Sequence, residues 1–311
     1  MDTLETKTPK LGASIKALSE DQSAVIVAVE ARELVAELGR RLGAFPVSLK
    51  HLGQALLAVT LLQDMGDPDD NEKLELQWNV AGSFGHLYAD SLGPGRLRGT
   101  IQKPQAEVFD FSEGLGAGLL QVRRTKPEGV TSTGLVSSEG SVADDLVRYL
   151  QDSEQRSCGM RLNVKIERDL EREALQDPFP FKVTQAVGYL VHVLPQEDPA
   201  RKDSLVRLWD QRMKVMGPLS EWAVPANSEE ALRFMIHLLT VGSKPVYFAP
   251  IPLEIYCTCS EERAKRALAL LSPRERKDLA NPMDDDKPVS SVVDLKCEYC
   301  GRVYLIGADA G

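Results

Sequence analysis

Four of the five cysteines in this 311-residue chain lie near its C-terminal end, as two close pairs. The first pair is Cys257 and Cys259, and the second is Cys297 and Cys300, followed directly by Gly301. Four thiolates can close a tetrahedral zinc site, and no histidine lies near either pair to supply another ligand. The sequence therefore predicts one Zn²⁺ bound by these four cysteines in the reduced protein.

The spacing within and between the pairs is unusual for a structural zinc site. Such sites commonly begin Cys-x2-Cys and place about 12 to 20 residues before the second pair. Here the first pair has the spacing Cys-x-Cys, and the segment from Cys259 to Cys297 is much longer. Zinc-bound thiolates are deprotonated, and the thiolate is the form of cysteine that reacts with peroxide or hypochlorite.

Composition excludes several classes of partner. A net charge of -9 and a pI near 5.2 argue against a surface for nucleic acid, which needs clustered Lys and Arg. Residues 1–7 lack the pattern of a signal peptide, and the apolar runs at 24–29 and 55–62 are too short to span a bilayer. We expect a cytoplasmic protein with neither a nucleic-acid nor a membrane partner.

The elements upstream of the cysteines predict an α+β core domain over residues 1–195. Residues 1–20 are polar and we expect them to be poorly ordered. Residues 73–136 alternate polar and apolar side chains between Gly and Pro turns, which predicts an antiparallel sheet. Helices are predicted at 30–42 and 46–64, and a third runs through 150 after an N-cap at Ser141 with Asp144 as its capping partner. Further strands are predicted at 24–29, 160–166 and 187–193.

Residues 196–250 differ in character and predict a helical linker, with helices at 204–216 and 228–241. Its apolar side chains form an ordinary packing stripe in one interpretation. In the other they form an adaptable surface for apolar partners. The candidates for that surface are Leu205, Leu208, Trp209, Met213, Met216 and Trp222.

Residues 251–311 are predicted to form a small zinc-binding domain. Ser260 is expected to cap one helix, and Ser272 with Glu275 to form the capping box of another. A solvated loop is expected at 281–291. Residues 292–296 and 303–306 predict a hairpin that carries the second cysteine pair.

The cysteine pattern, with its long helical spacer, resembles the C-terminal zinc domain of the 33 kDa heat-shock chaperonin family, the redox-regulated holdases. The resemblance extends over nearly the whole chain, since three upstream segments follow that family's signatures in the same order. They are 97–99 (Leu-Arg-Gly), 149–155 (Tyr-Leu-Gln-Asp-Ser-Glu-Gln) and 188–195 (Gly-Tyr-Leu-Val-His-Val-Leu-Pro). The chain departs from the family in a longer cysteine spacer, in the turn at 81–85 and in a short tail.

The resemblance implies a chaperone that binds unfolding proteins without ATP during oxidative stress. It also implies that oxidation pairs Cys257 with Cys259 and Cys297 with Cys300, releases the zinc and unfolds the linker. A Cys-x-Cys disulfide closes a very small ring and is expected to be easy to reduce, which suits a reversible switch. The sequence leaves open whether the oxidised form is a homodimer.

Three other functions compete with this one. A dithiol-disulfide oxidoreductase would use Cys297 and Cys300, but the βαβ context of such enzymes is missing. A zinc module for nucleic acid would rest on basic residues near the cysteines, which are interspersed with acidic ones. A constitutive zinc-containing binding protein would keep its metal permanently. No catalytic group is predicted, and Cys158 is expected to be an inert side chain.

Overall fold

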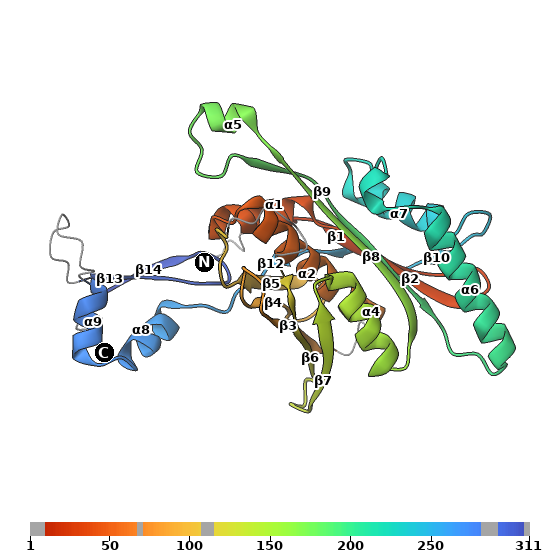
Figure 1. Cartoon of the computed structure of the whole chain (residues 1–311), viewed down its shortest axis with the longest axis horizontal. Helices are drawn as coiled ribbons and strands as arrows, with labels where there is room; N and C mark the ends of the chain where they lie inside the picture. Colours follow the sequence, from red (N-terminus) through yellow and green to blue (C-terminus); the bar gives the residue numbers. More distant parts are fainter. Residues whose placement is uncertain (1–9, 67–70, 107–114, 281–291, 308–311) are drawn as a thin grey trace, which may run out of the picture. The chain divides into compact units, whose positions relative to one another are not determined.

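The computed structural model describes residues 10–66, 71–106, 115–280 and 292–307. The chain forms two compact units, Met1–Tyr256 and Cys257–Gly311. The larger unit contains two mainly antiparallel sheets with helices packed on them (Figure 1). The predicted α+β class, with antiparallel sheets and packed helices, is therefore confirmed.

The first sheet has the strand order β10-β1-β2-β9-β8, and β11 also pairs with β1. Its strands are β1 (Ala13–Leu18), β2 (Ala24–Glu30), β8 (Ser157–Arg168), β9 (Phe181–Val193), β10 (Val246–Tyr247) and β11 (Ile251–Pro252). The hairpin of β8 and β9 is longer than predicted and ends in a short helix, α5 (Leu170–Ala174), which projects from the rest of the unit in Figure 1. Strand β8 lies at one edge of this sheet.

The expectation that residues 1–20 are poorly ordered was wrong for the strand β1. Ile15 and Ala17 are buried in the core, and the strand pairs along its whole length with β2. Its polar residues also have partners, since the Ser14 hydroxyl donates to the Asp64 carboxylate and Lys16 Nζ donates to the Gly66 carbonyl at 2.9 Å. The strand pairs with β2, the next strand along the chain, and with the distant strands β10 and β11. Residues 1–9 lie outside the described residues.

The second sheet has the strand order β12-β5-β4-β3-β6-β7. Its strands are β3 (Lys73–Val80), β4 (Leu87–Ser91), β5 (Arg96–Ile101), β6 (Ala117–Thr125), β7 (Thr131–Glu139) and β12 (Glu254–Ile255). The predicted sheet over 73–136 is thus confirmed. The short strand β12 was not predicted, and it joins the sheet in parallel with β5.

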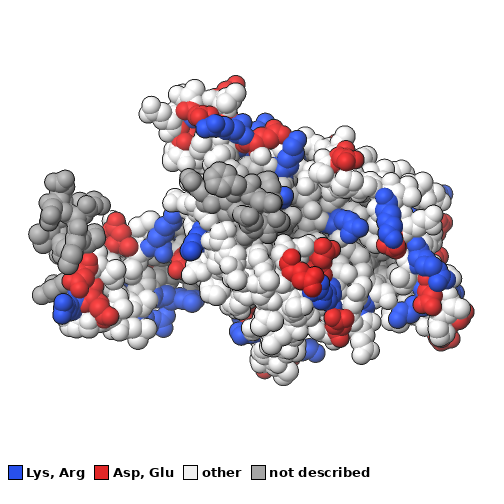
Figure 2. Space-filling view, viewed as in Figure 1, with Lys and Arg blue, Asp and Glu red and all other residues white. Residues whose placement is uncertain are grey.

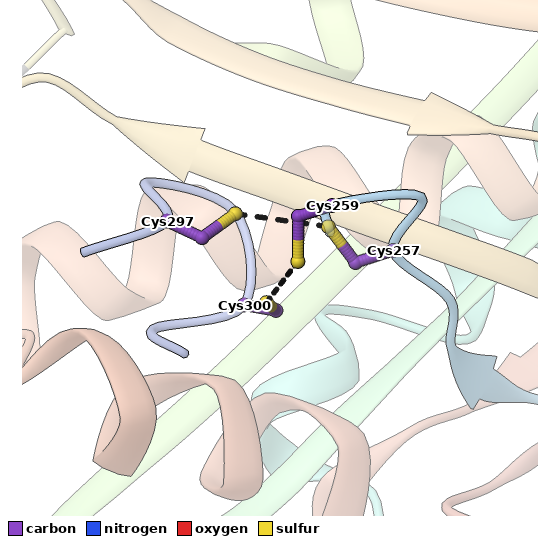
Figure 3. A group of neighbouring side chains, drawn as sticks. All are labelled: Cys257, Cys259, Cys297 and Cys300. Atoms are coloured by element: carbon purple, nitrogen blue, oxygen red, sulfur yellow. Dashed lines mark hydrogen bonds between the residues drawn. The ribbon is translucent and has the colours of Figure 1, made fainter. Parts of the chain in front are cut away.

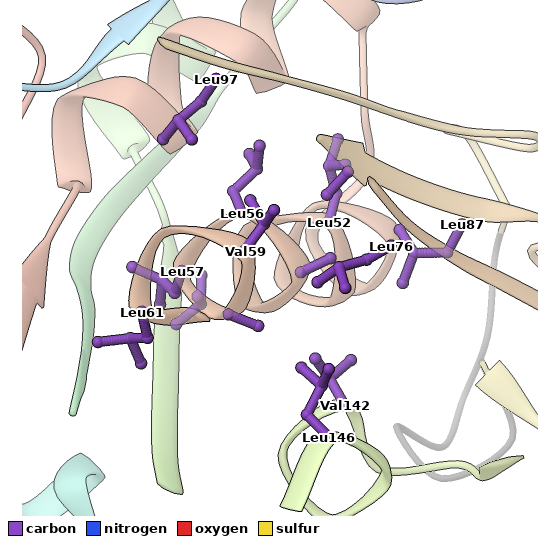
Figure 4. Packing of buried hydrophobic residues seen from close by; sticks show 14 of the residues in the cluster. Leu52, Leu56, Leu57, Val59, Leu61, Leu76, Leu87, Leu97, Val142 and Leu146 are labelled. Carbon is purple, nitrogen blue, oxygen red and sulfur yellow. The ribbon is translucent and has the colours of Figure 1, made fainter. Parts of the chain in front are cut away.

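Helix α2 (Pro46–Met65) packs against strands of both sheets and forms the centre of the larger unit. Leu56 points to one side of it and Leu57 and Leu61 to another, and all three are buried together with residues of both sheets and of α4 (Figure 4). The predicted apolar stripe on one face therefore understates its burial. A helix that is apolar on all sides is stable only when it is covered on all sides.

Two further helices, α1 (Arg32–Leu42) and α4 (Val142–Asp152), belong to the same core as α2. The Ser141 hydroxyl accepts a hydrogen bond from the Asp144 amide at the start of α4, as the capping pattern predicted. The opposite face of the first sheet carries α6 (Pro199–Val215), the 3-10 helix η2 (Leu219–Glu221) and α7 (Ser228–Leu239). Helix α6 begins earlier than predicted, because Asp198 caps it ahead of Pro199.

Candidate metal centre

In its described residues the smaller unit contains two helices and one hairpin, as the sequence predicted. The helices are α8 (Glu261–Ala269) and α9 (Pro273–Ala280), and the hairpin pairs β13 (Val292–Lys296) with β14 (Val303–Gly307). The Ser260 hydroxyl accepts from the Arg263 amide, which confirms the predicted cap. Both hydrogen bonds of the capping box between Ser272 and Glu275 are present. The loop predicted at 281–291 lies outside the described residues.

The second cysteine pair lies in the tight turn that joins the hairpin strands. The Gly301 amide donates to the Cys297 carbonyl at 2.9 Å, and the Cys297 amide donates to the Arg302 carbonyl at 2.8 Å. Gly301 has φ +71°, in the left-handed region that favours glycine. A glycine after Cys300 therefore lets the chain turn back into β14 while both thiols stay on the inside of the turn.

The first cysteine pair lies in the short loop between β12 and α8. The Arg263 guanidinium, from the first turn of α8, donates to the Thr258 carbonyl at 3.2 Å and to the Thr258 hydroxyl at 2.9 Å. These two bonds attach the residue between Cys257 and Cys259 to the helix. Arg263 is one of the basic residues near the cysteines that the sequence analysis considered for nucleic acid. Its role in positioning the first cysteine pair was not predicted.

The four sulfur atoms converge on one point, although they come from two distant segments of the chain (Figure 3). All four Sγ atoms lie within 4.8 Å of one another. Cys257 Sγ lies 3.7 Å from Cys297 Sγ, and Cys259 Sγ lies 3.4 Å from Cys300 Sγ. A tetrahedron with Zn–S bonds of about 2.3 Å has edges of about 3.8 Å. The donor set and its spacing fit a tetrahedral metal site.

The environment of the cluster changes the acidity of its thiols in both directions. The pKa values of Cys257 and Cys300 are both raised, and burial is the largest cause in each case. Cys300 is the more buried of the two. Burial also acts to raise the pKa of Cys259. There it is outweighed by hydrogen bonds from the Tyr304 hydroxyl, at 3.1 Å, and from the other thiols, which lower the pKa to about 7. Cys259 is thus the thiol with the strongest tendency to be a thiolate.

The linker residues predicted to form an apolar surface lie against the first sheet. Trp209 and Met213 of α6 are buried, whereas Leu208 is 41% exposed and points away from the core. Leu205 and Trp222 are half-buried beside the same cluster, and Met216 is half-buried at the end of α6. Most of the predicted set therefore packs on the sheet.

Two isolated side chains outside the cysteine cluster, Cys158 and His192, belong to no group of possible metal ligands among the described residues. Burial raises the pKa of Cys158 to about 12, so this thiol stays protonated at neutral pH. Burial lowers the pKa of His192 to about 4, so its imidazole stays neutral. The two side chains lie opposite each other on β8 and β9. Both belong to the packed sheet rather than to the cysteine cluster.

Many charged side chains of the described residues have a neighbour of opposite sign. On the face shown in Figure 2, Lys and Arg lie beside Asp and Glu and do not form a continuous basic patch among the described residues. Several of these neighbours are ion pairs, such as Lys265 with Glu261 at 2.6 Å. In the described part of the chain, no helix is both long and apolar enough to cross a membrane.

Comparison with known proteins identifies relatives of the whole chain. The family model described as Hsp33 protein matches residues 13–307. A 33 kDa chaperonin of Thermus thermophilus is 28% identical, covering 94% of this chain and 84% of the relative, and one of Bacillus subtilis is 26% identical, covering 94% of each. The crystal structure of a 33 kDa chaperonin from Thermotoga maritima matches with a TM-score of 0.79 at 20% identity, covering 96% of each chain.

Proposed function

The chain belongs to the Hsp33 protein family, and from this premise we propose that it is a holdase chaperone that uses no ATP and is activated by oxidation. Members of this family are chaperones and not enzymes, which agrees with the prediction that the chain has no catalytic site. Its partners are unfolding client proteins. We further propose the division into a core domain at 1–195, a linker at 196–250 and a redox-switch domain at 251–311.

The observation that carries this proposal is the convergence of the four cysteine sulfurs within 4.8 Å. One Zn²⁺ bound there would hold Cys257, Cys259, Cys297 and Cys300 as thiolates and so keep them reactive towards oxidants. Oxidation of two thiolates forms one disulfide and transfers two electrons to one molecule of peroxide or hypochlorite. Two such steps consume all four ligands.

The disulfides proposed for the oxidised form are Cys257 with Cys259 and Cys297 with Cys300. In the reduced arrangement, the sulfur contacts of 3.7 Å and 3.4 Å cross between the two pairs instead. All four sulfurs nevertheless lie within 4.8 Å of one another, so either pairing needs only short movements. Pairing within each motif would leave no sulfur to join the first loop to the hairpin. Mass spectrometry of the oxidised protein distinguishes this pairing from the crossed one.

Within the larger unit, the linker packs on the first sheet through an apolar face and several specific contacts. The Trp222 ring stacks on Tyr189 with centroids 5.8 Å apart, and its Nε1 donates to the Met216 carbonyl at 2.9 Å. Gln185 Nε2 donates to the Leu219 carbonyl at 3.2 Å. Many of the linker's other charged side chains are exposed, so the apolar face and these bonds provide most of its attachment.

The chain between α7 and the first cysteine is also anchored. The strands β10 and β11 pair with β1, and the Tyr256 amide next to Cys257 donates to the Leu97 carbonyl at 2.9 Å. Any disturbance that starts at Cys257 reaches β12 and β11 before it reaches α7. We propose that loss of the metal loosens these short strands first, and that the apolar face of α6 and α7 is then released to bind clients.

The deciding experiment follows the aggregation of a chemically unfolded client in the presence of this protein. Reduced, zinc-loaded protein and oxidised, zinc-free protein are compared in parallel, with zinc release measured on the same samples. We expect only the oxidised form to suppress aggregation. Equal suppression by both forms would retain the chaperone and discard the switch, which is the outcome expected of a constitutive zinc-containing binding protein.

A further inference from the structure

The side chain of Tyr304 connects the small hydrophobic core of the smaller unit with its cysteine cluster. The tyrosine hydroxyl donates a hydrogen bond to Cys259 Sγ at 3.1 Å. The ring packs against the buried apolar side chains of the unit, which are Leu268, Ala280, Val293 and Ile306. One residue therefore contacts both of the structures that can stabilise this unit.

The register of the hairpin explains why this tyrosine points towards the core. Tyr304 lies opposite Leu295 in the β13–β14 ladder, and both side chains pack against the buried cluster. Side chains alternate between the two faces of a strand, and the neighbours Val303 and Leu305 are exposed, whereas Ile306 is buried. Tyr304 thus belongs to the covered face of β14, on which its ring has a fixed place.

The hydrogen bond joins the two segments of the chain that supply the cysteines. Cys259 lies in the loop before α8, whereas Tyr304 belongs to the hairpin strand that follows the second cysteine pair. The sulfur–sulfur contacts between the same segments, at 3.7 Å and 3.4 Å, each need a cysteine from both pairs. Tyr304 adds a link between the segments that needs only one of the four cysteines.

Arg302 makes the tyrosine a stronger hydrogen-bond donor. Its exposed side chain forms a hydrogen bond with the Tyr304 hydroxyl. A guanidinium has donors only, so it donates to the hydroxyl oxygen and leaves the hydroxyl proton for Cys259. Hydrogen bonds in a chain polarise one another, and a charged donor strengthens the bond that it makes. The chain of donors therefore runs from Arg302 through Tyr304 to Cys259.

Such a donor has a definite effect on a sulfur that is bound to a metal. A metal ligand is already deprotonated, so a hydrogen bond cannot increase its fraction of thiolate. The bond withdraws electron density from the sulfur, and a less basic thiolate is a weaker nucleophile. Hydrogen bonds to metal ligands also fix their orientation, and the loss of one commonly lowers metal affinity about tenfold to hundredfold.

We propose that Tyr304, assisted by Arg302, is a positioning residue that holds Cys259 at the metal and makes its thiolate less reactive towards oxidants. Attack of this sulfur on peroxide forms an S–O bond, breaks the O–O bond and releases hydroxide, which is protonated to water. The sulfur supplies the electron pair of the new bond, so the hydrogen bond slows this step. Tyr304 thereby raises the concentration of oxidant at which the switch responds. This inference rests on the proposed function, because it takes the four sulfurs to be zinc-bound thiolates.

The test compares the reduced, zinc-loaded full chain with its variant Tyr304→Phe, which keeps the ring in the core and removes only the hydroxyl. The probe is iodoacetamide, which alkylates thiolates, and tandem mass spectrometry gives the initial rate at each cysteine. We expect Cys259 to react about threefold to tenfold faster in the variant, and the other three ligands to react at unchanged rates.

The matched control is Tyr256→Phe, which removes an exposed tyrosine hydroxyl beside the first cysteine pair and should react like the parent. Faster alkylation of all four cysteines in Tyr304→Phe would mean that the variant merely loosens the unit. An unchanged rate at Cys259 would mean that the hydrogen bond has no effect on the sulfur. Either result would overturn the proposal.

A second variant decides the question even if Tyr304→Phe does not fold. Arg302→Met removes an exposed guanidinium, keeps the backbone hydrogen bonds of the turn, and should speed the alkylation of Cys259 alone by about twofold. Zinc release by peroxide, followed with a chromophoric chelator, should be faster in both variants, and zinc affinity should fall about tenfold in Tyr304→Phe. Release at the parental rate in both would contradict the proposal. Failure of the redox switch in the aggregation assay is a separate result and leaves these rates unaffected.

Discussion

The two units of the molecule achieve stability by different means. The larger unit encloses α2 between two sheets, and one buried cluster joins α1, α2, α4 and strands of both sheets. The smaller unit has one small buried cluster in its described part, made of Leu268, Ala280, Val293 and Ile306. Apolar burial contributes about 25 cal/mol per Å², so a cluster of this size gives little support once chain entropy is subtracted. The comparison indicates that the cysteine cluster replaces a hydrophobic core in the smaller unit.

This difference fits the proposed function, in which an oxidant would act on one part of the protein and leave the structure of the other unchanged. A structural zinc site contributes about 10–16 kcal/mol of folding free energy, more than the net stability of many domains. That support depends on four reactive sulfurs and can be removed by chemistry. The support of the larger unit is distributed over many apolar contacts that an oxidant does not affect.

Removal of the metal should give the largest effect and tests the comparison directly. With a chelator or with Cys300→Ser, we expect amide protection to be lost in α8 and in the β13–β14 hairpin, because the cluster is the main support of both. Hydrogen exchange read by mass spectrometry should show unchanged protection in α2 and β9. Cys158→Ser is the matched control and should keep both patterns. Retained protection in the smaller unit would contradict the comparison.

A cavity created beside the central helix α2 should have an effect of intermediate size. We expect this effect in the larger unit and not in the smaller one. Leu56 is 1% exposed between the two sheets, so Leu56→Ala should lower the free energy of unfolding of the larger unit by about 2–5 kcal/mol. Leu175→Ala, at a side chain that is 82% exposed, is the control and should change it by less than about 0.5 kcal/mol. Denaturant unfolding and zinc content are measured together. A loss of zinc from Leu56→Ala would show that the units are not independent.

A change of pH should affect the stability of the two units in opposite directions, and we expect this to be the smallest of the effects. Burial raises the pKa of Asp64 to about 6 from its ordinary value of 3.8, against the opposing effect of the hydrogen bond from Ser14. The stability that this carboxyl contributes is fully present below pH 3.8 and is lost as the pH rises through about 6. The shift of about two units corresponds to about 3 kcal/mol. Metal binding changes in the other direction, because thiolate ligands are protonated as the pH falls.

The measurement for this prediction is the free energy of unfolding of the larger unit between pH 4 and 7. Asp64→Asn keeps a neutral acceptor for the Ser14 hydroxyl and should flatten that dependence by up to about 3 kcal/mol. Zinc content measured in parallel should fall towards low pH equally in both proteins. If the variant and the parent lose stability in parallel as the pH rises, Asp64 is not the group responsible.

Prediction from the sequence succeeded where the pattern is local. The helix caps at Ser141, Ser260 and Ser272 and the cysteine hairpin were recognised correctly, because each depends on residues only a few positions apart. The strand β1 and the short strands β10, β11 and β12 were missed. The three short strands are stabilised by partners far along the chain, and a strand of two residues has no detectable period.

The sequence by itself determined the four-cysteine donor set and the family, since these depend on residue type and spacing. The tertiary structure decided that α2 is enclosed on all sides, and that the two cysteine pairs meet within 4.8 Å. These features arise from contacts between distant segments, whose geometry is set by how the whole chain packs and cannot be read from spacing along it.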